Sequence, residues 1–230
     1  MTGRHARVVL DVGSTVLVLV AAVALLWTLY QDRGRNADVA AAATQNLRDI
    51  TIDSAGATKQ IGRGPIAIVE FADFQCPFCA RHARDTFPHI RTKLIDTDRV
   101  TYVAFALPLQ SHPLARKAGE AAECAAREGK YWEMHRTLFQ EPLRLDAPDL
   151  LRAAESIGLE RARFEDCLGN GAADAVASDI QRALRLTVSA TPTFFVGQLR
   201  EDGKINVLKR LNGALPFEAF EAAVDHVSKL

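Results

Sequence analysis

The 230-residue sequence has no excess of charge of either sign, no internal repeat and only four cysteines. Its 28 Lys and Arg residues balance 28 Asp and Glu residues, so the formal net charge is +0 and no overall field favours nucleic acid or an acidic partner. Hydrophobic residues make up 48% and charged residues 24% of the chain, which argues against extensive disorder. These absences indicate a folded domain of ordinary size whose partners are selected by a local surface.

One long hydrophobic run is present, at residues 12–30, and it contains no charged residue. As a helix it would be roughly 28 Å long, close to the thickness of the hydrocarbon layer of a bilayer. Trp27 and Tyr30 lie at its far end, where aromatic rings favour the headgroup layer. The run therefore predicts a transmembrane anchor. A cleaved signal peptide is the alternative, but the alanine run at 40–43 follows the hydrophobic run only after several charged residues.

The anchor divides the chain into four parts. A short cytoplasmic N-terminus covers 1–11, the anchor 12–30, a linker 31–60 and a folded domain 61–230. The linker is assigned because this stretch is polar, rich in Ala, Gly and Thr, and has little periodicity. Arginines flank the anchor on both sides, so the charge pattern alone does not set its orientation in the membrane.

The folded domain shows the pattern of an α/β protein. Residues 66–71 form a short apolar, β-branched run that is typical of a strand buried on both faces of a parallel sheet. A helix is predicted from Pro77 to about Leu94, with a kink or interruption at Pro88. Further strands are predicted at 99–107, 193–196 and 205–211, several short helices in an inserted subdomain at about 112–186, and a closing helix at 216–230.

Cys76 and Cys79 are separated by Pro77 and Phe78, and they follow a predicted strand at the start of a predicted helix. In this context a C-x-x-C motif indicates a redox-active pair. The helix N-terminus would stabilise the thiolate of Cys76 and make it a good leaving group, with Cys79 as the resolving partner. A structural disulfide and half of a zinc site are the alternatives, but no other residues have the spacing of zinc ligands. No metal or cofactor is predicted.

Two segments, at 70–79 (EFADFQCPFC) and 190–197 (ATPTFFVG), carry a resemblance to a known family. They resemble the DsbA-like thioredoxin-fold proteins, especially the membrane-anchored or secreted branch, over roughly 61–230. The His112-Pro113 opening of the helical insertion and the stretch at 130–135 also look like that branch. The resemblance implies a thioredoxin fold with an inserted helical subdomain, preceded by an N-terminal transmembrane helix, and protein disulfide oxidoreductase activity.

The resemblance also implies roles for Pro192, Thr191 and Glu70. Pro192 would be a cis-proline facing the redox pair, and Thr191 would shape the pocket where a substrate strand docks. Glu70 matches a buried acid of the family, whose raised pKa would allow it to relay the proton of Cys79. Taken alone, Thr191-Pro192 is compatible with a plain loop before a strand, and Glu70 with a surface position at the edge of a strand.

Phe78 departs from the best-known oxidase of the family, which has a histidine that stabilises the thiolate at this position. Phenylalanine supplies neither that hydrogen bond nor that charge. We therefore expect the pKa of Cys76 to be less depressed and the disulfide to be less oxidising than in that oxidase. Redox activity thus follows more directly from the sequence than the direction of electron flow does.

Cys124 and Cys167 lie on separate predicted helices of the insertion. A structural disulfide between them is predicted, and it would contribute roughly 4 kcal/mol on the chain-entropy model. Two buried free thiols are the alternative. Because such a disulfide survives only in an oxidising compartment, it predicts that the N-terminus lies in the cytoplasm and the domain outside.

The sequence therefore predicts an extracytoplasmic thiol-disulfide oxidoreductase held in the cell membrane by a single helix. It would donate its disulfide to reduced or misoxidised exported proteins and be reoxidised by a membrane redox partner. Two alternatives are a reductase or isomerase of the same fold, and a thioredoxin-fold chaperone or binding module.

Overall fold

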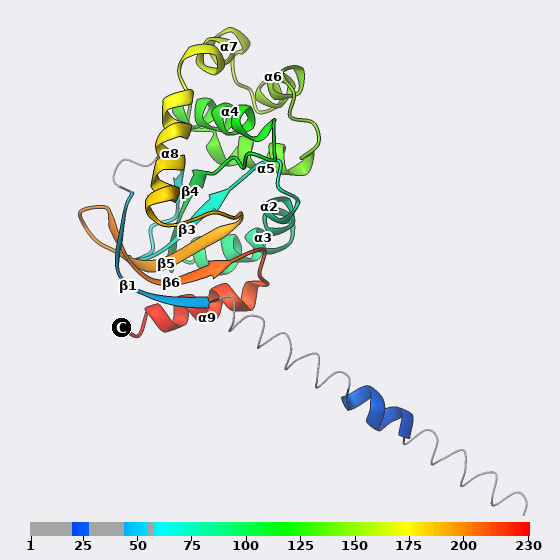
Figure 1. The fold of residues 1–230 in the computed structure, drawn as a ribbon, viewed down its shortest axis with the longest axis vertical. Helices are drawn as coiled ribbons and strands as arrows, with labels where there is room; N and C mark the ends of the chain where they lie inside the picture. The colour runs from blue at the N-terminus through cyan, green and yellow to red at the C-terminus, as the bar shows by residue number, and fades with distance from the viewer. Residues whose placement is uncertain (1–19, 28–43, 55–57) are drawn as a thin grey trace, which may run out of the picture. The chain divides into compact units, whose positions relative to one another are not determined.

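A computed structural model describes residues 20–27, 44–54 and 58–230 (Figure 1). The chain consists of two compact units, Met1–Ala42 and Ala43–Leu230. In the first unit, residues 20–27 are helical with exposed side chains, and the rest of the predicted anchor lies outside the described residues. In the part of the chain that is described, no helix has both the length and the hydrophobicity needed to cross a membrane.

The second unit is built on a six-stranded mixed sheet with the order β1-β6-β5-β3-β4-β2. Its strands are β1 (Thr44–Asp53), β2 (Gln60–Ile61), β3 (Ile66–Ala72), β4 (Val100–Ala106), β5 (Thr193–Leu199) and β6 (Lys204–Asn212). Only β3 and β4 pair in parallel, and every other pair is antiparallel. The expectation of a parallel sheet thus holds for the central strand–helix–strand unit alone.

The segment predicted to be a linker, 31–60, contains β1 and the start of β2, so the prediction is wrong for these residues. β1 pairs with β6 at 44–46 and 50–53, with an irregularity between these stretches, and Ile52 lies opposite Ile205. Ile52 is also buried in the core, with 2% of its surface exposed. The strand forms because it pairs with β6. Its own sequence is weakly periodic and does not indicate a strand.

A helical segment follows β3, as predicted, and its α-helical pattern is interrupted on both sides of the short stretch that contains Pro88. The segment consists of α2 (Pro77–Arg81), a π-helical turn η1 (His82–Thr86), α3 (Phe87–Ile90) and a second π-helical turn η2 (Arg91–Ile95). The N–H of Phe87 donates to the carbonyl of His82, five residues earlier. These wider turns on either side of α3 accommodate a proline that has no N–H to donate.

The predicted helical insertion lies between β4 and β5. It consists of α4 (Ala115–Arg127), α5 (Tyr131–Gln140), α6 (Ala147–Ser156), α7 (Arg161–Asn170) and α8 (Ala173–Arg185). A disulfide between Cys124 and Cys167 joins α4 to α7, as the sequence predicts. The two cysteines are 43 residues apart, so this bond stabilises the insertion by about 4 kcal/mol on the chain-entropy model.

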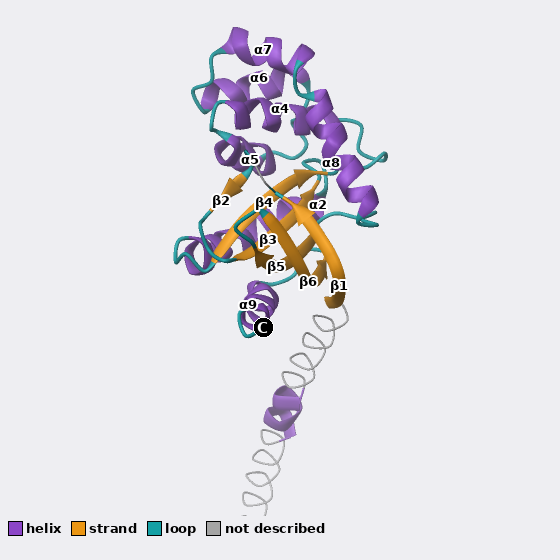
Figure 2. Ribbon diagram, turned by 90° about the vertical axis from the view of Figure 1, so that its left-hand side faces the viewer, coloured by secondary structure: helices purple, strands orange, loops and turns teal. Residues whose placement is uncertain are grey.

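Helices cover both faces of the sheet (Figure 2). The segment 77–95 and α9 (Phe217–Val227) pack on one face, where Ile68, Tyr102 and Phe194 are buried. α8 packs on the other face, against apolar side chains that include Val69 and Phe71. All seven residues of β3 are buried, so alternate positions of this strand point into two different cores.

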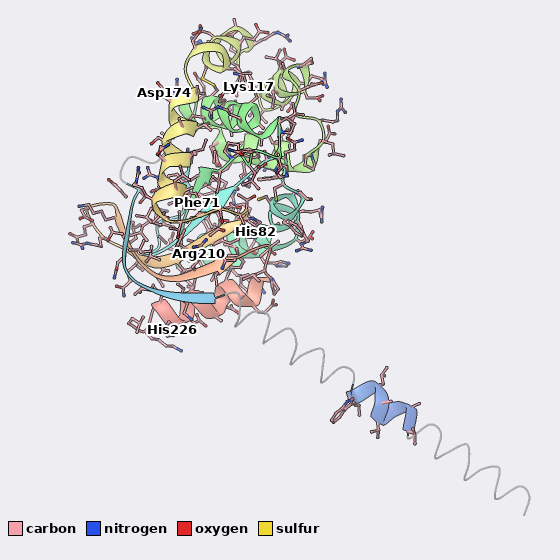
Figure 3. The ribbon with its side chains drawn as sticks, in the orientation of Figure 1. Phe71, His82, Lys117, Asp174, Arg210 and His226 are labelled. Carbon is pink, nitrogen blue, oxygen red and sulfur yellow. A yellow bond between two sulfur atoms is a disulfide. The ribbon has the colours of Figure 1, made fainter. Side chains whose placement is uncertain are left out.

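Glu70 is the single charged residue of β3. It lies two positions after Ile68, so its side chain is on the same face of the sheet as that of Ile68. It therefore lies beneath the helical segment that begins after Cys76. Figure 3 labels His82 on this helical segment and Phe71 on β3. A carboxyl group is thus buried between the central strand and the helix that carries the cysteine pair.

Candidate active site

The loop after β3 places Cys76 at the N-cap of α2, with an extended backbone (φ −75°, ψ 121°). The buried carboxylate of Asp73 holds this loop in place. It accepts hydrogen bonds from the N–H of Gln75 at 2.7 Å, the N–H of Leu109 at 2.8 Å and Nδ1 of His112 at 2.8 Å. Asp73 therefore ties the cysteine loop to the segment that leads from β4 into the helical insertion.

Hydrogen bonds lower the pKa of Cys76 to about 5. The largest contribution comes from the thiol of Cys79, and the side chain of Thr191 and the N–H groups of Phe78 and Cys79 add to it, whereas burial acts in the opposite direction. In its thiol form, Cys76 donates from Sγ to the carbonyl oxygen of Thr191 at 3.5 Å. The first sulfur of the pair is therefore held as a stabilised thiolate near neutral pH.

The surroundings of Cys79 raise the pKa of its thiol, whereas those of Cys76 lower it. The side chain of Cys79 is completely buried. Burial raises the pKa of Cys79 well above its usual value, and the sulfur of Cys76 and the charge of Glu70 raise it further. At neutral pH this sulfur holds a proton, so the two sulfurs differ sharply in their acidity.

Glu70 is 1% exposed, and burial raises its pKa to about 7 although a hydrogen bond from Tyr102 lowers it. Oη of Tyr102 donates to Oε2 of Glu70 at 3.0 Å, and Nε2 of His82 lies 3.1 Å from the same hydroxyl. The carboxyl therefore exchanges a proton near neutral pH next to a thiol of high pKa. A surface position for Glu70, which the sequence alone allowed, is excluded.

The Thr191–Pro192 peptide bond is cis, and both residues are buried. The carbonyl of Thr191 accepts the hydrogen bond from Cys76, so this loop lies directly against the first sulfur. The hydroxyl of Thr191 is buried next to this sulfur, and its interaction with Cys76 is one of those that lower the pKa of Cys76. Pro192 has no N–H, which leaves this side of the sulfur without a backbone donor.

Phe78, between the two cysteines, points to solvent and is 53% exposed. The guanidinium of Arg81 lies 5.2 Å from the centre of its ring. An exposed aromatic side chain beside a reactive sulfur offers apolar contact area to a docking polypeptide.

The structure brings together the residues that the sequence proposed for the site. These are Cys76, Cys79, Glu70, Thr191 and Pro192. Cys124 and Cys167 form a separate disulfide in the insertion. Over the residues that the structure describes, no three His, Cys, Asp or Glu side chains are grouped so that they could hold a metal ion.

Sequence reasoning assigned no role to Asp73, Tyr102, His82 or His135, although each contacts the site or its immediate support. Asp73 could have been noticed, because it is a charged residue directly after a buried strand and before the motif. Tyr102 lies in an apolar run that is expected to pack in a core, and His82 and His135 lie on helices among polar and apolar residues with no motif around them. Only the fold brings these residues to Glu70 or to its hydrogen-bond partner.

The thiolate of Cys76 is directly measurable. We expect its absorbance, and its rate of alkylation, to titrate with a midpoint near pH 5 in the reduced protein, because the thiolate is the reactive form. In Cys79→Ala the midpoint should rise, since the largest stabilising hydrogen bond is lost. An unchanged midpoint in Cys79→Ala would contradict this account of the site.

Comparison with known proteins agrees with this geometry. The family model Thioredoxin_4, described as thioredoxin, matches residues 62–225. The Na⁺/H⁺ antiporter NhaA 3 of Salinispora tropica is 42% identical over 145 residues, which are 62% of this chain and 22% of the antiporter. The chain thus spans about a fifth of the length of the curated relatives that it matches.

Two solved structures are similar over most of the chain. α-DsbA1 of Wolbachia pipientis has 23% identity and a TM-score of 0.64, and the match covers 74% of this chain and 90% of that one. A thioredoxin-like oxidoreductase of Silicibacter pomeroyi has 25% identity and a TM-score of 0.60, covering 74% and 92%. The chain therefore belongs to the thioredoxin family, with the fold of the DsbA-like thiol-disulfide oxidoreductases and a cysteine pair at the end of its central strand.

Proposed function

We propose that this protein is a thiol-disulfide oxidoreductase that exchanges a Cys76–Cys79 disulfide with cysteines of other proteins, most directly as a disulfide donor. The observation that carries the proposal is the contrast between the two sulfurs. Cys76 has a pKa of about 5, and Cys79 has one well above that of an ordinary thiol. A stable thiolate on one side of a disulfide makes transfer of the bond to another protein favourable.

The exchange takes place in two steps. A substrate thiolate attacks Sγ of Cys76, the Cys76–Cys79 bond breaks, and Cys79 leaves with the electron pair and takes a proton from Glu70. A second substrate thiolate then attacks the substrate sulfur of the mixed disulfide and expels the thiolate of Cys76. The substrate has lost two electrons to the cysteine pair and leaves with a disulfide.

The surface around Cys76 supports a polypeptide substrate. The loop of Thr191 and Pro192 lies against the first sulfur, and the ring of Phe78 is exposed beside it. A substrate segment in extended form would place its cysteine at Cys76 between these two features. Thr191 and Pro192 then act by holding the substrate chain, with no part in the electron transfer.

The direction of transfer rests on the acidity of Cys76. Reactive cysteines of this fold range from a pKa of about 7 in thioredoxin, a reductant, to about 3.5 in DsbA, a strong oxidant. A value of about 5 for Cys76 supports an oxidising role without the histidine that Phe78 replaces. A membrane redox partner would reoxidise the pair after each turnover.

Oxidation of a reduced peptide that contains two cysteines tests the activity. Cys76→Ala and Cys79→Ala should each lower the rate to that of the uncatalysed reaction, because neither variant can form the disulfide that is transferred to the peptide. A double variant, Cys124→Ala with Cys167→Ala, is the matched control and should retain the activity. Full activity in Cys76→Ala would contradict the proposal and favour a binding or chaperone module.

The location of the domain is part of the same proposal. The uncharged run at 12–30 supports a membrane anchor, and the Cys124–Cys167 disulfide supports an oxidising compartment outside the cytoplasm. In that location, exported proteins with reduced or misoxidised cysteines are the available substrates.

Cell fractionation tests this location. The full chain should sediment with membranes and resist extraction by alkaline carbonate, whereas a chain without residues 1–31 should not. Protease added outside the cytoplasmic membrane should digest the domain. Recovery of the full chain in the soluble fraction, or a domain protected from the protease, would contradict the location.

A further inference from the structure

The proton of Glu70 has no direct route to water. The carboxyl lies in the middle of β3 and is 1% exposed. Oε2 accepts the hydrogen bond of Tyr102 at 3.0 Å, whereas Oε1 is buried and has no hydrogen-bond partner in the described part of the chain. A group that gives a proton to Cys79 in each turnover must recover it from solvent, so a second group has to connect it to the surface.

His135, on α5, is placed to make this connection. Its Nε2 lies 3.9 Å from Oε2 of Glu70, and this nitrogen is also buried without a hydrogen-bond partner among the described residues. Buried polar atoms without a partner are rare and call for an explanation. A movement of about 1 Å would bring the carboxyl and the ring nitrogen into hydrogen-bond distance.

The surroundings of His135 keep its ring neutral. The rings of Phe139, Trp132 and Phe74 lie at centroid distances of 4.7, 5.2 and 5.8 Å. Burial among them lowers the pKa of His135 to about 3. The 3.9 Å approach to Glu70 is therefore not an ion pair. A neutral imidazole has one nitrogen that donates a proton and one that accepts.

His135 also reaches a cavity that Glu70 does not line. This cavity has a volume of about 470 Å³ and lies between the helical segment after Cys79 and α5. Phe87, Trp132 and Phe139 are among its apolar lining residues, and the exposed residues Arg84, Arg136 and Gln140 also contribute to its wall. The other buried imidazole, His82, contacts Tyr102 but is not part of this wall.

We propose that His135 is a positioning residue that connects the Glu70 carboxyl to solvent through this cavity. Its contribution to catalysis rests on the proposed function. When the disulfide is reduced, Cys79 leaves with the bonding electrons and takes the proton of Glu70. The carboxylate takes a proton from Nε2 of His135, and the other ring nitrogen takes one from water in the cavity. The imidazole remains neutral, and the reverse sequence removes the proton when the pair is reoxidised.

Infrared spectroscopy of the full chain in D₂O tests the connection without a substrate. Glu70 is protonated below its pKa of about 7, and the carboxyl band that disappears in Glu70→Gln belongs to it. We expect His135→Gln, which is similar in size but cannot relay a proton between two ring nitrogens, to slow the H/D exchange of this band at least about tenfold. Phe139→Leu alters the same cavity wall without removing a base, and its exchange should match that of the unchanged protein.

His135→Ala separates proton transfer from packing. The truncation leaves room in the cavity wall, and added imidazole should restore the exchange of Glu70. Unchanged exchange in both His135 variants, or slowing that imidazole does not reverse, would overturn the proposal. Failure of the peptide oxidation assay in the unchanged protein would overturn the proposed function instead, because the exchange of Glu70 is measured without thiol chemistry.

Discussion

The hydrogen bonds that Cys76 receives at the start of α2 determine which sulfur of the pair is the better leaving group. They come from the thiol of Cys79, the side chain of Thr191 and two backbone N–H groups, and they outweigh the burial that favours the neutral thiol. Cys79 lies one helical turn deeper, where burial, the sulfur of Cys76 and the charge of Glu70 raise its pKa and outweigh a hydrogen bond with the backbone of Asp73. The rest of the site depends on this difference, because a symmetrical pair would have no preferred sulfur for attack.

The fold maintains the difference through three separate elements. Asp73 fixes the loop before Cys76, the Thr191–Pro192 loop places the Thr191 side chain near the sulfur of Cys76, and β3 carries Glu70 beneath Cys79. A buried carboxyl is costly to a domain core, and this one has a single hydrogen-bond donor, Tyr102, among the described residues. The proton transfer to Cys79 that we propose gives this buried carboxyl a function that offsets its cost.

The central unit was predictable because its signals are local. The apolar run at 66–71 identified β3, and the cysteine spacing identified the start of α2. Outside this unit, the two remaining cysteines predicted the disulfide of the helical insertion. The cis Thr191–Pro192 bond and the buried Glu70 followed only from the resemblance to a family. Each of these assignments needed no knowledge of how distant segments pack.

The remaining features arise from contacts between distant segments. β1 forms because β6 pairs with it. β5 and β6 follow the helical insertion in the sequence and pair antiparallel to each other. His135 meets Glu70 because α5 packs against the helical segment after Cys79. No periodicity or motif in either segment indicates that meeting, so the path from Glu70 to solvent emerges only from the structure.

The reduction potential of the Cys76–Cys79 pair is the measurement that tests the central claim most directly. Equilibration with glutathione buffers gives this potential, and a stabilised Cys76 thiolate makes the pair oxidising. The account predicts a value between about −270 mV, the potential of thioredoxin, and about −120 mV, that of DsbA. A value at or below about −270 mV would contradict a disulfide donor and indicate a reductase.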